Sequence, residues 1–161
     1  MTLFNTPLYV FDSGPLIKMK DYPEDIFPSM WAKFHEMIST NQIISCREVY
    51  NEITQNYAVE DDISRWAKRN SSLFLTPQVA ELEKVREILT KFPLLIREEE
   101  TLSTKPQADP FVIAQAWENS CVLVHQEKLK PNAPKIPNVC AHFGVKELSL
   151  HAFFRERGWT F

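Results

Sequence analysis

Glycine and long hydrophobic runs are both scarce in this sequence of 161 residues. Only three glycines occur, against eleven prolines, which disfavours the flexible linkers that separate domains. The longest apolar runs have about four residues, far fewer than the roughly 20 that a membrane helix needs. The first residues also lack the basic start and the apolar stretch of a secretory signal. We therefore expect residues 1–161 to form a single cytoplasmic domain with no membrane partner.

An excess of positive charge is also missing. The chain has 18 lysines and arginines against 21 aspartates and glutamates, which gives a formal net charge of −3. Proteins that hold nucleic acid by bulk electrostatic attraction carry a basic surface, so the charge balance disfavours that class. An enzyme that reaches a phosphate through a bound cation is compatible with the same balance.

Cysteine pairs and nucleotide-binding motifs are absent as well. The three cysteines, Cys46, Cys121 and Cys140, form no C-x-x-C motif, and an odd number cannot pair completely within one chain. Free thiols in a reducing cytoplasm are therefore the expected state. The sequence contains neither G-x-G-x-x-G nor a P-loop, which excludes the dinucleotide and nucleoside-triphosphate binders that depend on them.

Short apolar runs alternate with longer stretches of helical periodicity, which is typical of an α/β domain. Strands are expected at residues 8–11, 43–44, 72–75, 121–124 and 145–150. Helices are expected after Pro28, around residues 49–53 and 63–67, and over residues 79–92, 111–117 and 151–157. The apolar run 121–124 indicates a central strand buried on both faces. We therefore predict a three-layer α/β/α sandwich with a central, mainly parallel sheet.

Acidic residues stand at the predicted ends of several elements. Ligands of an open α/β sheet bind outside the carboxyl ends of its strands. Asp12 comes directly after the first strand, and Glu127 lies just beyond the run 121–124. The helix after the second strand carries Glu48 and Glu52 on one face, since they are four residues apart. Asp109 stands at the start of the covered helix. Four segments can thus bring carboxylates to one rim of the sheet.

Each acid also has a purely structural explanation. Asp12 suits the turn after the first strand, and Asp109 before a proline has the form of a helix N-cap. Glu48 and Glu52 suit the solvated face of a helix, for which Ser45 is the expected N-cap. Glu127 lies in a polar loop, where solvation is usual. Mg²⁺ and Mn²⁺, however, prefer oxygen ligands from a few carboxylates, waters and a substrate phosphate. The joint occurrence of four such segments therefore indicates a metal site for phosphodiester chemistry.

Four segments resemble the motifs of the PIN-domain family, in the same order along the chain. They are residues 9–13 (YVFDS), 48–53 (EVYNEI), 108–114 (ADPFVIA) and 122–127 (VLVHQE). In that family an acid followed by Ser or Thr ends the first strand, and a glutamate directly precedes Leu or Ile. An aspartate then opens a helix, and a strand is followed by Thr, a variable residue and Asp. The second motif selects Glu52 over Glu48, and the resemblance covers nearly the whole chain.

The resemblance implies a Mg²⁺- or Mn²⁺-dependent endoribonuclease. Its metal would lie among Asp12, Glu52, Asp109 and Glu127, with Ser13 assisting beside the first acid. The PIN-like toxins of bacterial and archaeal toxin–antitoxin pairs are the most similar members. The resemblance therefore also implies an RNA substrate, an antitoxin that holds the enzyme inactive, and a homodimer.

Two residues depart from the PIN pattern. His125 replaces the usual hydroxyl residue, and Glu127 is one methylene longer than the usual aspartate, so Glu48 becomes an auxiliary candidate for the fourth acid. His125 either orients a phosphate or water at the rim or has the commoner role of a structural histidine at a strand end. Lysines flank the third and fourth motifs, where they either guide the RNA backbone or are simply solvated. They are Lys105, Lys128, Lys130 and Lys135.

The sequence is also compatible with two other functions. The first is a catalytically silent PIN-fold module that binds only a partner protein, because the substitutions at 125 and 127 weaken the fourth motif. The second is a phosphohydrolase with an aspartyl nucleophile. That chemistry commonly uses a D-x-D strand end, and the residue two beyond Asp12 is Gly14, which has no side chain to donate a proton.

Overall fold

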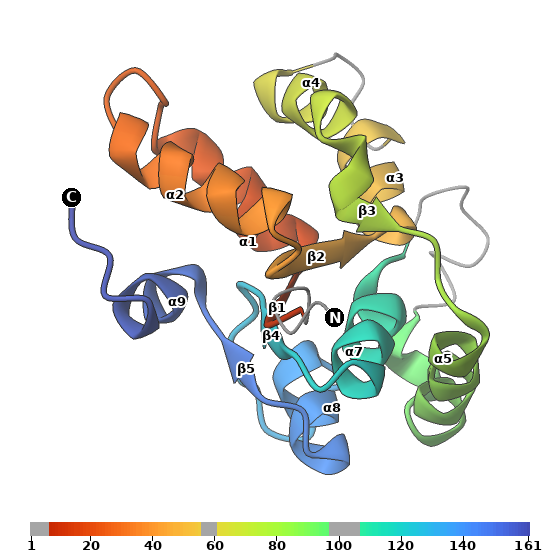
Figure 1. Cartoon of the computed structure of the whole chain (residues 1–161). Coiled ribbons are helices and arrows are strands. Elements are labelled where there is room, and N and C mark those ends of the chain that lie inside the picture. The colour runs from red at the N-terminus through yellow and green to blue at the C-terminus, as the bar shows by residue number, and fades with distance from the viewer. Residues whose placement is uncertain (1–6, 56–60, 97–106) are drawn as a thin grey trace, which may run out of the picture.

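A computed structural model describes residues 7–55, 61–96 and 107–161, and its centre is a five-stranded sheet (Figure 1). The strands are β1 (Tyr9–Phe11), β2 (Ile43–Cys46), β3 (Phe74–Leu75), β4 (Val122–Val124) and β5 (Glu147–Leu148). Their order is β3-β2-β1-β4-β5, and every neighbouring pair is parallel. In register, Tyr9 lies opposite Ile43 on one side and Val122 on the other. The predicted parallel sheet is confirmed.

Helices cover both faces of this sheet (Figure 1). One layer contains α1 (Ser13–Lys18), α2 (Pro28–Ser39) and α9 (Leu150–Glu156), and the other contains α5 (Val79–Lys91), α7 (Asp109–Glu118) and α8 (Ile136–Phe143). The chain passes from β2 to β3 through α3 (Arg47–Gln55), α4 (Asp62–Arg69) and the 3-10 turn η2 (Ser71–Leu73). Two further 3-10 turns are η1 (Met19–Asp21) and η3 (Pro93–Leu95). The fold is the predicted three-layer α/β/α sandwich. Across the described ranges, no helix combines the length and apolarity needed to cross a membrane.

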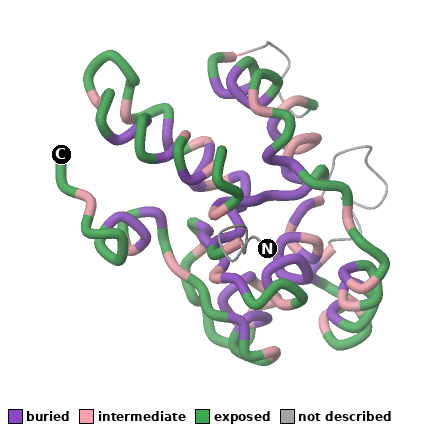
Figure 2. The backbone as a smooth tube through the Cα atoms, viewed as in Figure 1, coloured by how far each residue is buried: buried purple, intermediate pink, exposed green. Residues whose placement is uncertain are grey.

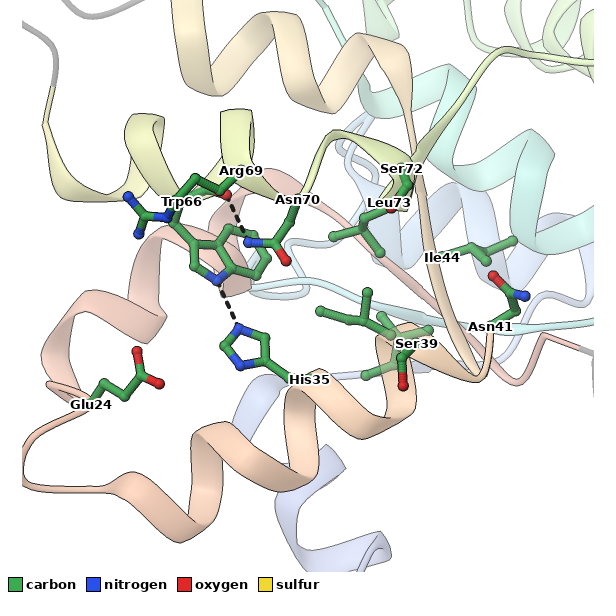
Figure 3. A pocket seen from close by; sticks show the side chains of 12 residues that line it. Glu24, His35, Ser39, Asn41, Ile44, Trp66, Arg69, Asn70, Ser72 and Leu73 are labelled. Carbon is green, nitrogen blue, oxygen red and sulfur yellow. Dashed lines mark hydrogen bonds between the residues drawn. The ribbon is translucent and has the colours of Figure 1, made fainter.

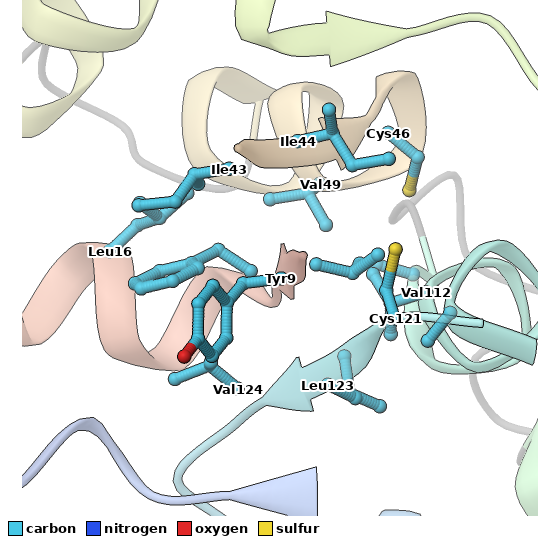
Figure 4. Packing of buried hydrophobic residues seen from close by; sticks show 14 of the residues in the cluster. Tyr9, Leu16, Ile43, Ile44, Cys46, Val49, Val112, Cys121, Leu123 and Val124 are labelled. Carbon is cyan, nitrogen blue, oxygen red and sulfur yellow. The ribbon is translucent and has the colours of Figure 1, made fainter. Parts of the chain in front are cut away.

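The apolar runs in the strands form the core because helices cover them from both sides. Phe11 is fully buried, and its ring lies 5.5 Å from that of Phe34 in α2 and 5.1 Å from that of Phe153 in α9, centroid to centroid. Figure 4 shows Leu16 of α1 and Val112 of α7 among the side chains of the central strands. The buried residues follow the strands and the inner sides of the helices in Figure 2. This core fixes the position of the strand ends.

Two predicted helix caps differ from the observed ones. Ser45 is not an N-cap, because β2 continues through Cys46 before α3 begins. Its buried hydroxyl instead donates a hydrogen bond of 2.7 Å to the carbonyl oxygen of Phe11, which links β2 to β1. Ala108, rather than Asp109, occupies the N-cap position of α7, so Asp109 is the first residue of that helix.

The C-terminal third also differs from the prediction. β5 covers two residues instead of 145–150, because Ser149 caps α9 by accepting a hydrogen bond of 3.1 Å from the N–H of Ala152. Residues 136–143 form α8, a helix absent from the predicted elements. Pro137 lies in its first turn, and Gly144 ends it in the left-handed conformation, with a φ of 71°.

The three cysteines are free, as the sequence predicts, and all three are buried. Burial raises the pKa of the Cys46 and Cys140 thiols to about 12 and that of the Cys121 thiol to about 11. Because the thiolate is the reactive form, these thiols are poor nucleophiles and poor metal ligands at neutral pH. The cysteines are therefore not candidates for the functional site.

Candidate active site

Asp12 is the central residue of the carboxyl edge. It directly follows β1, and its backbone N–H donates to the carbonyl oxygen of Val124 at 3.0 Å, which fixes it between β1 and β4. The residue is only 6% exposed. It occupies the N-cap position of α1, yet its side chain makes no capping hydrogen bond. Its Oδ1 is buried and has no hydrogen-bond partner within the described ranges. Helix capping therefore does not explain this acid.

Glu52 connects the segments that carry the other two acids. Its Oε1 accepts a hydrogen bond of 3.0 Å from the hydroxyl of Ser13, and its Oε2 accepts one of 3.2 Å from the backbone N–H of Ala108. Ser13 directly follows Asp12, and Ala108 directly precedes Asp109. The carboxylate on α3 thus ties the start of α1 to the start of α7. Three of the four predicted acidic segments meet at this edge.

The electrostatics of Asp12 show which acids share its surroundings. Its pKa is raised well above the ordinary value of 3.8, chiefly by burial and next by the carboxylates of Asp109 and Glu52. Glu127 adds a smaller upward effect, and the backbone N–H of Ser13 opposes the shift. These surroundings therefore disfavour the ionised form of Asp12.

Glu127 lies at the margin of the cluster and has a second role. Its Oε2 accepts a hydrogen bond of 2.8 Å from the backbone N–H of Ile136, the first residue of α8. An anion at this position stabilises the helix through the dipole and the unpaired N–H groups of the first turn. Of the three carboxylates that raise the pKa of Asp12, it has the smallest effect. This capping role has no signal in the sequence, because the predicted elements do not include α8.

The auxiliary residues are placed less centrally. His125 is 2% exposed, and both ring nitrogens are engaged, one by the N–H of Glu127 at 3.0 Å and the other by the carboxylate of Glu147. It therefore supports the rim and does not face a substrate. Glu48 is half-buried, and burial raises its pKa, but it is not among the carboxylates that shift Asp12. Glu147 is not predictable from the sequence, because a pairing across 22 residues leaves no local pattern.

The donor set suits an open metal site better than a closed one. Nowhere in residues 7–55, 61–96 and 107–161 is a group of three or more His, Cys, Asp or Glu side chains arranged to hold a metal ion. Mg²⁺ commonly binds through one or two carboxylates and keeps several waters for exchange with substrate phosphates. A buried carboxyl oxygen with no hydrogen-bond partner among the described residues, beside further carboxylates, fits that open kind of site.

A separate groove of about 550 Å³ lies between α2 and α4 and includes none of these acids. In Figure 3 the indole N–H of Trp66 points to the ring of His35, to which it donates at 3.1 Å. The floor includes Ile44, near the amino end of β2. The charged lining residues Glu24 and Arg69 have opposite signs, so the groove does not single out a phosphate or a cation.

One family model matches the sequence, over residues 9–161, and it describes a domain of unknown function, DUF4411. The chain belongs to this family. The match begins at β1 and includes all four acids of the edge and both residues of the His125–Glu147 pair. A comparison of this chain with curated proteins gave no match.

The metal-free DUF4411 domain should lose stability as the pH rises above 4. The raised pKa of Asp12 means that the folded state keeps a proton that the unfolded chain has already released. Stability from this group is fully present below the unfolded pKa of 3.8 and is lost as the pH rises through the folded pKa. The slope for one proton is at most about 1.4 kcal/mol per pH unit. Urea unfolding in EDTA across this window measures the loss.

The matched control for this prediction is Asp12→Asn, which removes the titrating group. Other carboxylates contribute to both curves, so the difference between wild type and variant isolates Asp12. We expect that difference to favour the variant increasingly as the pH rises. A difference that stays constant with pH would show that Asp12 has an ordinary pKa.

Proposed function

We propose that this DUF4411 domain is a Mg²⁺- or Mn²⁺-dependent endoribonuclease of the PIN type. The observation that carries the proposal is Asp12. Its carboxyl group is buried at the end of a central strand, has an oxygen without a partner in the described ranges, and lies in the field of three other carboxylates. Burying an anion in such a place is costly unless a cation compensates it.

The residues that would hold the cation are Asp12, Glu52 and Asp109, while Glu127 lies at the margin of the cluster and caps α8. A bound divalent cation supplies two effects, since it neutralises charge on a phosphodiester and lowers the pKa of a bound water. Without it, burial and the neighbouring carboxylates raise the pKa of Asp12 and so favour its protonated form.

The chain itself supplies the orientation of these acids. The hydroxyl of Ser13 and the N–H of Ala108 hold the two oxygens of Glu52, so this carboxylate cannot rotate freely. The backbone of Asp12 is fixed to Val124. Such preorganisation reduces the entropy lost when a substrate binds in a reactive geometry. Ser13 is therefore a positioning residue in this proposal and does not need to touch the substrate.

Cleavage of a labelled single-stranded RNA by the purified domain tests the proposal. We expect cleavage with Mn²⁺ or Mg²⁺, loss of cleavage in EDTA, and recovery when the metal is restored. Glu52→Gln should lower the rate by about a hundredfold, because the amide removes the negative charge and can accept only one of the two hydrogen bonds that orient the carboxylate. Glu48→Gln, on the same helix one turn away, should cleave like wild type. Equal rates for the two variants, or cleavage that resists chelation, would contradict the proposal.

The silent protein-binding module is the second candidate, and two observations favour it. The described residues contain no ready-made group of metal ligands, and the fourth acid caps a helix. A folded domain that shows neither RNA cleavage nor a change in melting temperature with Mn²⁺ would support this alternative.

We further propose that the domain is the toxin of a toxin–antitoxin pair. This step rests on the PIN resemblance alone, and it adds an antitoxin and a homodimer as partners. Its test is independent of the cleavage assay, because it measures growth.

A further inference from the structure

The loop between β4 and α8 carries a concentration of positive charge beside the acidic edge. Lys128 and Lys130 are exposed, Lys135 is half-buried, and Leu129 between the first two is 70% exposed. No ion pair joins any of these lysines to another residue of the described part of the chain. In a domain with a net charge of −3, these ammonium groups remain available to an anionic partner.

Both ends of this loop are held by one residue, Glu127. Its backbone N–H donates to Nδ1 of His125 at 3.0 Å, and its Oε2 accepts from the N–H of Ile136 at 2.8 Å. A backbone N–H can only donate, so Nδ1 must be the acceptor, and the ring proton lies on Nε2, facing the carboxylate of Glu147. Glu147 on β5 thereby fixes His125, which fixes Glu127.

The loop itself has a defined turn. The carbonyl oxygen of Lys130 accepts from the N–H of Ala133 at 3.2 Å and from the side-chain amide of Asn138 at 3.0 Å. Asn132 adopts the left-handed conformation, with a φ of 59°, which asparagine tolerates better than most residues. The lysine charges are thus attached to a folded turn that is tied back to α8.

The start of the loop touches the acidic edge directly. A Cβ atom on Gly14, in the first turn of α1, would lie 3.2 Å from Cβ of Gln126, so the two segments are packed closely. The carboxylate of Glu127, the residue after Gln126, raises the pKa of Asp12. Any phosphodiester at the acidic edge therefore lies near the beginning of the basic loop.

We infer that residues 128–135 form an arm that binds the phosphate backbone of RNA, and that Glu127 is the clasp of this arm and not a direct metal ligand. The inference rests on the proposed ribonuclease function and names the surface that holds its substrate. An acidic edge repels RNA, and adjacent lysines offset that repulsion without reading the base sequence. The long glutamate in place of the usual aspartate suits the clasp, because it reaches the first N–H of α8.

The salt dependence of RNA binding tests the arm. The binding constant K falls as salt is added, and each phosphate contact in a single strand makes the fall of log K with log salt steeper by about 0.7. Lys128→Gln/Lys130→Gln should therefore make this dependence less steep by roughly 1.4. The matched control is Lys91→Gln/Lys146→Gln, which removes two exposed lysines at the end of α5 and just before β5, away from the carboxyl edge. Fluorescence anisotropy with a labelled single-stranded RNA gives the slopes. Equal slopes for the two double variants overturn the inference.

Two substitutions of Glu127 test the clasp. In Glu127→Gln the amide oxygen still accepts from Ile136, whereas Glu127→Ala loses this bond. We expect Glu127→Gln to keep the Mn²⁺-induced rise in melting temperature, and Glu127→Ala to raise the KM for RNA by about fivefold while it also keeps that rise. If Glu127→Gln loses the Mn²⁺ effect as fully as Asp12→Asn does, Glu127 is a metal ligand and the clasp is overturned.

The two proposals fail in different ways. If the wild-type domain cleaves RNA but its RNA binding has the same salt slope as that of Lys128→Gln/Lys130→Gln, the RNA-binding role of the arm is wrong and the ribonuclease function still stands. A wild-type domain that neither binds nor cleaves RNA overturns both.

Discussion

Asp12→Asn should abolish the stabilisation of the domain by Mn²⁺ and lower RNA cleavage by about three orders of magnitude. An ion that binds only the folded state stabilises it by mass action, by about 2.7 kcal/mol at a hundredfold excess over Kd. For a domain of this size that corresponds to a rise of roughly 5–10 °C in Tm. The neutral amide contributes no charge to the cation. A loss of about 4 kcal/mol in transition-state stabilisation gives the expected thousandfold decrease in rate.

The same substitution should have the opposite effect on the metal-free protein. In the metal-free wild type, burial and three neighbouring carboxylates oppose the ionisation of Asp12, and asparagine, which does not ionise, removes that cost. We therefore expect Asp12→Asn to melt above the wild type in EDTA and below it in Mn²⁺. This crossover separates a metal ligand from a merely structural residue, whose loss would lower Tm under both conditions.

Asp25→Asn is the matched control, because Asp25 is an exposed acid in the segment before α2. It should give the wild-type Mn²⁺ shift and the wild-type cleavage rate. If Asp12→Asn shows a Mn²⁺ shift equal to that of the control, the cation binds elsewhere, and the candidate site loses its main support.

The fold is predictable from the sequence where apolar runs dominate. The residues of β1 and β4 are continuously apolar because both faces of each strand are buried, and this signal needs no knowledge of distant contacts. The helix α8 gives a much weaker signal. It has eight residues and is apolar around most of its circumference, so its periodicity does not distinguish it from a loop or a strand.

The acids of the site are predictable as positions, but their hydrogen bonds are not. Asp12 can be found because it ends a central strand, where ligands of parallel sheets gather. The bond from Ala108 to Glu52, by contrast, spans 56 residues and involves a backbone N–H, which has no sequence signature. The role of Glu127 as a cap depends on α8, so it could not be inferred before that helix was known.

The family match and the candidate site support different conclusions about this protein. The match over residues 9–161 assigns the chain to DUF4411 and carries no chemistry in its description. The chemistry is inferred from the environment of one carboxyl group and from the motif resemblance. A fold alone does not determine a function, so experiments on the acidic edge have to decide it.

Expression of the wild-type domain in bacteria should arrest growth, and Asp109→Asn should not. A toxin acts through its ribonuclease activity, and Asp109 opens α7 with a carboxylate that raises the pKa of Asp12. Removing this charge should weaken the cation site and restore colony counts by orders of magnitude. Induction from a tightly repressed promoter, with plating on inducer, measures the effect. Asp25→Asn, which leaves the edge intact, should arrest growth like the wild type.

The same assay identifies the antitoxin and tests how it acts. Co-expression of a gene adjacent to that of the domain should restore growth. An arginine from that partner is the most direct inhibitor of the acidic edge, because a guanidinium forms a bidentate pair with a carboxylate and so competes with the cation. We expect rescue to fail when the arginine that lies near Asp12 in the complex is changed to methionine. If wild type and Asp109→Asn affect growth identically, the toxin role is wrong. Metal-dependent cleavage in vitro would then still support a ribonuclease with a different role in the cell.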